Sequence, residues 1–295
     1  MKSESESKTG QSFSEGKIFD ENQVRCYDLL AMYSFQHRVA FALFALLPSA
    51  ACAQERSYSP AAYLHFDGAS QYVEVPSAPE FSVSDAGLTV SAWIMADTLT
   101  FPNTEGSGYV HWMGKGEAGK QEWVLRMYNE SNTEKPPRPN RISFYVFNSD
   151  GGLGVGSYFQ KPVKAKEWIQ VTGVVDGHRT YIYRNGAFER CDEFQGSPDG
   201  VCQAHPEVIR PQSNDAPLRI GTRDSRSFFQ GGLAEIRIWE RALSSSEIEA
   251  LYQSGSAPPA GLAAEFLLNE GEGTIAHDSA RHHDGRIVGA TWIRP

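Results

Sequence analysis

The sequence predicts an all-β protein, an antiparallel β-sandwich or jelly roll that carries one short helix in its C-terminal part. Short segments that alternate apolar and polar residues recur from residue 63 onward, and turn residues separate them. Only one segment shows the start and stop signals of a helix. The 27 glycines and 16 prolines among 295 residues agree with many turns, because these residue types interrupt strands and helices.

The predicted strands follow one another from Tyr63. The first two flank a loop at residues 67–70, and the third, Leu88–Met95, has apolar residues on both of its faces, as expected of a covered strand. The full set is Tyr63–Phe66, Tyr72–Val75, Leu88–Met95, Tyr109–Met113, Glu122–Tyr128, Ile142–Phe147, Trp168–Val175, Tyr181–Arg184, Leu218–Ile220 and Leu233–Trp239. Asn185-Gly186 predicts a tight hairpin after the strand that ends at Arg184, and the glycines at 151–156 predict a flexible loop or a bulge.

The predicted helix begins after Ser244, a serine N-cap with Glu247 three positions later, and ends near Gly255. So short a helix is not stable alone, and we expect it to pack on a sheet. Residues 54–255 are therefore predicted to form the sandwich. The remaining segment, 256–295, is too short to hold a core and contains no cysteine, so we expect it to dock strands onto that sandwich.

An export signal is predicted before the first strand. The apolar stretch Val39–Leu47 follows His37 and Arg38 and precedes Ala51-Cys52-Ala53, which predicts cleavage after Ala53 and a secreted, extracellular or periplasmic protein. The residues before Met32 are polar and acidic, so translation is predicted to start at Met32. The alternatives are a buried helix or a lipid anchor on Cys52, although Ser49 stands where a lipobox usually has Leu. No apolar run reaches ~18 residues, so no transmembrane segment is expected in the mature chain.

The charge and the cysteine content of the chain argue against nucleic-acid binding and against a structural zinc site. The chain has a net charge of −9 and no basic tract, which disfavours sequence-independent binding of nucleic acid. Cleavage after Ala53 leaves Cys191 and Cys202, which we expect to form a disulfide in an exported domain. Two cysteines are too few for a structural zinc site.

Six segments match a known pattern in order. They are Leu64–Gly68 with Tyr72–Pro76, Leu88–Ile94, Trp168–Gly177, Tyr181–Gly186, Gly232–Ser244, and the tail Gly261–Trp292. Together they resemble the laminin-G-like, concanavalin A-like jelly-roll modules of secreted bacterial proteins, and the likeness covers nearly the whole mature chain. The resemblance implies a jelly-roll fold, but it is less specific about function because such folds support binding modules and enzymes alike.

The resemblance also implies a structural calcium ion near a sheet edge. Asp67 is the first implied ligand, with a backbone carbonyl near Gly68 and the carboxylate of Glu235 as further ligands. The family pattern has an acidic pair where this chain reads Ala234-Glu235, so one carboxylate is missing. Calcium takes six to eight oxygen ligands, which backbone carbonyls or water would have to complete. The alternative is that Asp67 caps a turn and Glu235 faces solvent.

No catalytic residues and no cofactor-binding motif are predicted. The chain lacks the E-x-D-x-E, G-x-S-x-G, H-E-x-x-H and C-x-x-C patterns, and the glycine-rich stretch at 114–119 precedes a strand and not a helix, which predicts a hairpin loop. The sequence favours a non-catalytic module that binds a glycan or an extracellular protein. The alternatives are a polysaccharide hydrolase or lyase on the same scaffold, and a structural surface module without a small ligand.

Aromatic side chains are the predicted sugar-binding groups, because sugars stack their CH faces on such rings. Trp93, Trp168 and Trp239 are expected in the core. Trp112, Trp123 and Arg126 are the predicted ligand-binding residues. The polar loops at 103–108 and 129–140 are expected to carry specificity.

Overall fold

The structure is a computed structural model, and it describes residues 56–148, 154–194, 201–204, 210–211 and 213–295. The chain divides into two units, Met1–Ala53 and Gln54–Pro295, and the architecture below concerns the second. The predicted export signal and the start at Met32 lie outside the described residues. Among the residues described, no helix has the length and apolar character needed to cross a bilayer.

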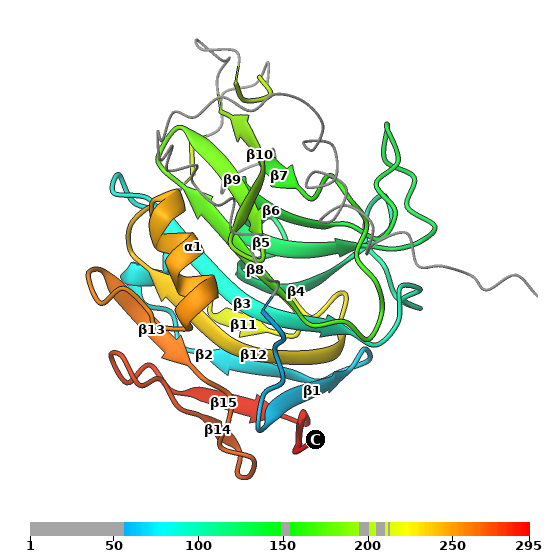
Figure 1. Ribbon diagram of the computed structural model, residues 1–295. Coiled ribbons are helices and arrows are strands. Elements are labelled where there is room, and N and C mark those ends of the chain that lie inside the picture. Colours follow the sequence, from blue (N-terminus) through cyan, green and yellow to red (C-terminus); the bar gives the residue numbers. More distant parts are fainter. Residues whose placement is uncertain (1–55, 149–153, 195–200, 205–209, 212) are drawn as a thin grey trace, which may run out of the picture. The chain divides into compact units, whose positions relative to one another are not determined.

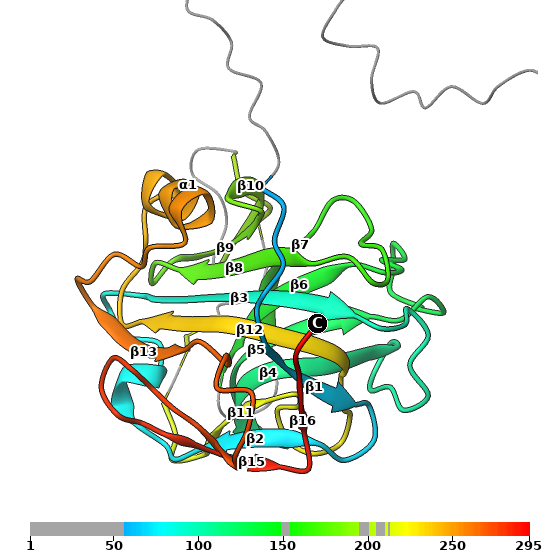
Figure 2. The same cartoon turned by 60° about the horizontal axis from the view of Figure 1, so that its bottom comes forward.

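Two antiparallel sheets form the fold, which confirms the predicted sandwich (Figures 1 and 2). The first, sheet A, has the strand order β10-β9-β8-β3-β12-β1-β16, and β13 also pairs with β12. Its strands are β1 (Tyr63–Asp67), β3 (Leu88–Ala96), β8 (Ile169–Val175), β9 (Arg179–Arg184), β10 (Ala187–Glu193), β12 (Gln230–Trp239), β13 (Leu262–Phe266) and β16 (Thr291–Ile293).

The second, sheet B, has the order β14-β15-β2-β11-β4-β5-β6-β7. Its strands are β2 (Tyr72–Val75), β4 (Tyr109–Glu117), β5 (Lys120–Tyr128), β6 (Ile142–Phe147), β7 (Gly154–Tyr158), β11 (Leu218–Ile220), β14 (Ile275–Ala276) and β15 (Gly285–Val288). A short 3-10 helix, η1 (Pro79–Phe81), follows β2. Of the 114–119 stretch predicted as a hairpin loop, residues 114–117 are the end of β4, and only residues 118 and 119 form the turn into β5.

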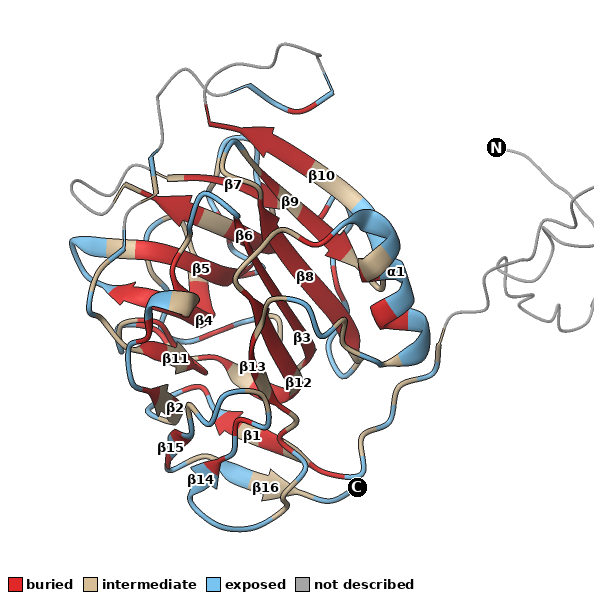
Figure 3. Ribbon diagram, turned by 90° about the vertical axis from the view of Figure 1, so that its left-hand side faces the viewer, coloured by how far each residue is buried: buried red, intermediate tan, exposed pale blue. Residues whose placement is uncertain are grey.

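The core lies between the two sheets, and most strands contribute alternate residues to it. Leu125 and Phe144 of sheet B meet apolar side chains of sheet A, such as Ile94 and Val171, in one continuous cluster. The central strands β3, β8 and β12 are buried along almost their whole length, as the red strands of Figure 3 show. Burial of this apolar area is the main stabilising contribution.

The strand β7 lies where the sequence predicted a loop or bulge. Its glycines make this strand possible: a Cβ at Gly154 would lie 2.4 Å from the Phe147 ring, and one at Gly156 would lie 2.3 Å from the Tyr145 ring. Glycine is required at both positions because rings from β6 cover the backbone there. The pattern of glycines therefore marks a close approach of side chains.

The helix α1 (Ser245–Ser254) has the predicted bounds and packs on sheet A. Ser244 caps it by accepting a hydrogen bond from the Glu247 amide, and the Glu247 carboxylate accepts one from the Ser244 amide. Gly255 ends the helix in the left-handed conformation at φ 71°. Ile248, Leu251 and Tyr252 form its buried face.

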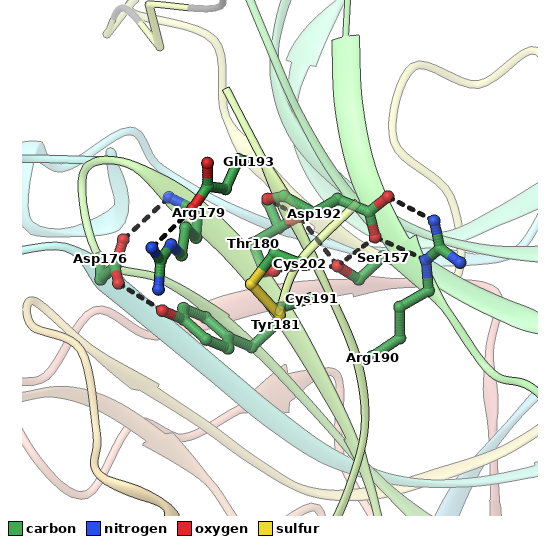
Figure 4. The surroundings of a disulfide bond; sticks show 10 residues. All are labelled: Ser157, Asp176, Arg179, Thr180, Tyr181, Arg190, Cys191, Asp192, Glu193 and Cys202. Atoms are coloured by element: carbon green, nitrogen blue, oxygen red, sulfur yellow. Dashed lines mark hydrogen bonds and ion pairs between the residues drawn. A yellow bond between two sulfur atoms is a disulfide. The ribbon is translucent and has the colours of Figure 1, made fainter. Parts of the chain in front are cut away.

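The predicted disulfide joins Cys191 on β10 to Cys202, with 4.9 Å between the Cα atoms (Figure 4). Beside it, Arg190 donates two hydrogen bonds of 2.7 Å to the Asp192 carboxylate, and Ser157 on β7 donates a third bond of 2.9 Å to it. These contacts tie the last strand of sheet B to the edge of sheet A.

The C-terminal segment 256–295 adds strands to both sheets. In sheet A, β13 pairs with β12 and β16 pairs with β1, while in sheet B β15 pairs with β2 and β14 pairs with β15. The segment therefore closes the sandwich at one edge.

Replacing Glu247 by Gln is expected to lower stability by about 1 kcal/mol at pH 7. The hydrogen bond from Arg241, with the capping bonds, lowers the pKa of Glu247 from 4.5 to about 2. A lowered pKa stabilises the fold above the unfolded pKa, and this stabilisation disappears as pH falls from about 5 toward 2. Urea unfolding should therefore show a difference between wild type and variant at pH 7 that shrinks near pH 2.5. A difference that is independent of pH contradicts this; Glu249→Gln on the same helix is the control.

Replacing both Cys191 and Cys202 by Ser is expected to reduce the free energy of unfolding by about 3 kcal/mol, because the bond closes a short loop in the unfolded chain. The sequence separation is 11 residues. Guanidinium unfolding measures the change. A reductant should lower the stability of the wild type to that of the variant and leave the variant unchanged; equal stability of oxidised wild type and variant would refute the expectation.

Candidate functional site

The face of sheet B that points away from the core carries tyrosine and arginine side chains. Alternation on β5 and β6 sends Trp123, Leu125 and Phe144 into the core, so their sequence neighbours lie on the opposite face. These outward residues, with one arginine from the loop after β5, form what we call the Arg–Tyr face. Its members are Tyr109, Arg126, Tyr128, Arg138, Tyr145 and Tyr158.

Arg126 lies at the centre of the Arg–Tyr face. Its guanidinium carbon is 3.6 Å from the Tyr145 ring centroid, 4.4 Å from that of Tyr109 and 5.6 Å from that of Tyr128. Burial acts to lower the pKa of Arg126, but these three tyrosines outweigh burial and raise it. Arg126 is therefore a permanent cation held by aromatic rings, an arrangement stabilised by cation–π attraction.

Arg138 holds the tyrosines in position. Its Nη1 donates a hydrogen bond of 2.9 Å to the Tyr145 hydroxyl and one of 3.3 Å to the Tyr128 hydroxyl, and its guanidinium lies 3.9 Å from the Tyr158 ring. Burial raises the pKa of Tyr145 to about 12. Burial also acts to raise the pKa of Tyr128, but the charges of Arg126 and Arg138 outweigh it and lower that pKa.

Two loops that the sequence predicts as specificity loops join beside this face. The Ser107 carbonyl accepts hydrogen bonds from the Asn132 side chain at 2.9 Å and from the Thr133 amide at 2.8 Å. The Ser107 hydroxyl donates to Glu134 at 2.8 Å. These hydrogen bonds hold the loop after β5 in place, and this loop positions Arg138 beside the sheet.

A cluster of Glu105, His111 and Asp224 lies next to Arg126, because His111 is the register partner of Arg126 on β4. The His111 Nδ1 is 3.0 Å from Glu105 and 3.7 Å from Asp224. Burial acts to raise the pKa values of both carboxyls, but contact with His111 outweighs it and lowers both, helped at Asp224 by Arg223. Among the described residues, this is the group whose ligand atoms lie close enough to hold a metal ion.

A separate cavity of about 300 Å³ lies beside sheet A. Tyr58, Glu235, Arg237 and Asn269 are among the residues that line it. Tyr58 stacks on Trp93 with 3.8 Å between ring centroids, and burial together with the Glu235 charge raises the pKa of Tyr58. The cavity contains an acid paired with an arginine, since Glu235 accepts a hydrogen bond of 3.0 Å from Arg237.

The structure does not bring the implied calcium ligands together. The Asp67 Oδ1 accepts hydrogen bonds from the amides of Ala69, Ser70 and Gln71, with Gly68 at φ 76°, so Asp67 closes the turn after β1. Asp67 pairs with Gln230 in register, whereas Glu235 lies past the other end of β1. Glu235 occupies a bulge of β12 and faces the cavity. The set of Asp67, Gly68 and Glu235 does not fit one calcium ion.

The predicted ligand-binding residues fall on opposite sides of sheet B. Trp112 and Trp123 are fully buried in the core, and the Trp123 indole donates a hydrogen bond of 2.7 Å to the Phe81 carbonyl. Neither indole presents a face to a ligand. Arg126 directly follows Leu125, which points into the core, and so lies on the outward face with the tyrosines. Sequence reasoning did not select the other members of the face, Tyr109, Tyr128, Arg138, Tyr145 and Tyr158. Alternation along β6, in which Phe144 points into the core, would have placed Tyr145 on the outward face.

Comparisons with known proteins agree with this architecture. A laminin G family model, described as the concanavalin A-like lectin/glucanases superfamily, matches residues 67–249. No curated protein matches the sequence.

Several solved structures are similar to this chain. A Bacteroides ovatus protein whose name proposes carbohydrate binding aligns with a TM-score of 0.55 at 19% identity, over 80% of this chain and 60% of its own. A pentraxin of Limulus polyphemus aligns at TM-score 0.44 and 14% identity, over 68% of this chain and 84% of its own. Domain 4 of an extracellular arabinanase from Geobacillus stearothermophilus, solved with arabinotriose, aligns with a TM-score of 0.43 at 18% identity, over 64% of this chain and 75% of its own.

The family model covers most of the sandwich, and the two antiparallel sheets have the architecture that it describes. The chain therefore belongs to the concanavalin A-like lectin/glucanases superfamily, as a jelly roll of the laminin G type.

Proposed function

We propose that this protein is an exported, non-catalytic module that binds carbohydrate on the Arg–Tyr face. The observation that carries the proposal is an array of tyrosines, held by Arg126 and Arg138, on the side of sheet B away from the core. The family and the name of the Bacteroides protein support carbohydrate as the ligand class. The disulfide is compatible with export, because such bonds persist in oxidising compartments.

The chemistry of this face suits a sugar. Tyr109, Tyr145 and Tyr158 are each half-buried, so part of each side chain remains available to the CH face of a sugar ring. Their phenol groups and the arginine N–H groups can hydrogen-bond to sugar hydroxyls. The rings are already held by Arg138, so binding would cost little side-chain entropy.

The acidic groups on this side favour binding over hydrolysis. A glycoside hydrolase needs one carboxyl with a raised pKa as general acid beside a second carboxylate. Glu105 and Asp224 both have lowered pKa values, so neither is kept protonated near neutral pH. The hydrolase or lyase alternative is tested by release of reducing ends or unsaturated products from polysaccharide pools.

Replacing Tyr145 or Tyr158 by Ala is expected to weaken binding to the glycan that a glycan array identifies by about fivefold each, the equivalent of about 1 kcal/mol for a lost ring contact. Isothermal titration measures the affinity. Phe188→Ala is the matched control, because Phe188 is an exposed aromatic residue (52%) on β10 of the other sheet. Full affinity in both tyrosine variants would locate the binding surface elsewhere.

Calcium binding stays a prediction, with Asp67 as its ligand. If Asp67 holds the ion, calcium should raise the melting temperature of the wild type, and Asp67→Asn should abolish this rise while the Asn oxygen still accepts the turn hydrogen bonds. Glu235→Gln should leave the rise unchanged, because Glu235 lies past the far end of β1. No rise in the wild type, or an equal rise in Asp67→Asn, would refute calcium binding at Asp67.

A further inference from the structure

Arg126 differs from the other buried cations of the described residues in having no acidic partner. Each of the other three contacts a carboxylate: Lys115 with Glu122 at 2.6 Å, Arg223 with Asp224 at 2.7 Å, and Arg237 with Glu265 at 2.8 Å. Arg126 is only 6% exposed, yet within the described chain neither a carboxylate nor another hydrogen-bond acceptor contacts its guanidinium. Such a buried, unpaired charge is unfavourable unless something compensates it.

The nitrogens of Arg126 are not equally enclosed. Nε is sealed from solvent and has no partner. The two terminal nitrogens also have no partner among the described residues, but they are not sealed, so the residual exposure of Arg126 includes the end of the guanidinium. A ligand group on the outer face can therefore reach the two Nη atoms without displacing the sheet.

The tyrosines around Arg126 compensate its charge only in part. Their rings supply cation–π attraction, but a ring face does not satisfy the five N–H donors of a guanidinium. The hydroxyls of Tyr128 and Tyr145 accept hydrogen bonds from Arg138 and not from Arg126. The planar fork of Arg126 is thus held in one orientation with its donors unused.

The neighbouring carboxylates are engaged by other groups. Arg138 also has tyrosines and not a carboxylate as its side-chain partners among the described residues. Glu134 acts on the pKa of Arg126 by its charge, but its Oε1 accepts the hydrogen bond of Ser107. His111 is turned to Glu105 and Asp224. Among the described residues, no carboxylate therefore contacts the guanidinium group of Arg126 or that of Arg138.

We propose that Arg126 binds an oxyanion group of an acidic polysaccharide, the carboxylate of a uronic acid or a sulfate ester, and that Arg138 adds to the attraction. The inference rests on the proposed carbohydrate function and names its ligand class. A bidentate contact from the two Nη atoms to an oxyanion uses two of the free donors and compensates the charge at once, whereas a neutral sugar cannot compensate the charge. The adjoining tyrosines would stack on the ring that carries the anionic group.

The test is binding of the full chain to paired polymers by affinity electrophoresis and isothermal titration. The pairs are polygalacturonate with its fully methyl-esterified form, and dextran sulfate with dextran. We expect binding to an acidic member and at least tenfold weaker binding to its neutral partner. A difference within the polygalacturonate pair indicates a carboxylate ligand, and a difference within the dextran pair indicates a sulfate ligand.

Arg126→Gln is expected to weaken binding to the acidic polymer at least tenfold, and Arg126→Lys, which keeps the charge but loses the planar fork, should weaken it less. Arg286→Gln is the matched control, because it removes the same charge from β15, at the opposite end of sheet B. Circular dichroism and melting temperature report whether each variant folds. If Arg126→Gln fails to fold, the inference is tested by the affinity of Arg126→Lys for the acidic polymer and by the comparison of the acidic and neutral polymers with the wild type.

Three outcomes overturn this inference: unchanged binding of the acidic polymer by folded Arg126→Gln, an equal loss in Arg286→Gln, or equal affinity of the wild type for both members of each pair. Binding of a neutral glycan that Tyr145→Ala weakens and Arg126→Gln does not would leave the carbohydrate function standing and remove only the acidic ligand. Absence of binding to every acidic and neutral polymer would refute both.

Discussion

The burial of alternate side chains between two antiparallel sheets is the constraint on which the rest of this structure depends. Trp123, Leu125 and Phe144 point inward because the core requires apolar groups, so Arg126 and Tyr145 must point outward. The outer face of sheet B is thereby defined by the same alternation that forms the core. A slip of one residue in β5 would bury Arg126 among apolar side chains and expose Trp123.

Close packing on that outer face then decides what the side chains can do. Gly156 lets the Tyr145 ring lie against the backbone of β7, and Arg138 fixes its hydroxyl. Arg126 is left enclosed by rings, with donors that those rings do not satisfy. The tyrosines that stabilise the buried charge are therefore the same groups that we propose contact a sugar.

Several elements were predictable because their signals are local. The capping residues of α1, Ser244 and Glu247, act within one helical turn, and the alternation of each strand acts over neighbouring residues. The disulfide was predictable because only Cys191 and Cys202 remain after the predicted cleavage. The strand β7 was not predictable, because its glycines are required by contacts with rings on β6, and sequence spacing does not reveal these contacts.

The sequence by itself determined the layered all-β architecture, the helix and the pairing of the cysteines, since each follows from residues that are near in the chain or few in number. The candidate site was accessible only in part: Arg126 was selected, but Trp112 and Trp123 were grouped with it although they face the core. Only the tertiary structure brought Arg138 from its loop onto the ring of Tyr158 on β7 and separated Asp67 from Glu235. Those relations depend on strand order and register, which join residues distant in sequence and leave no local pattern.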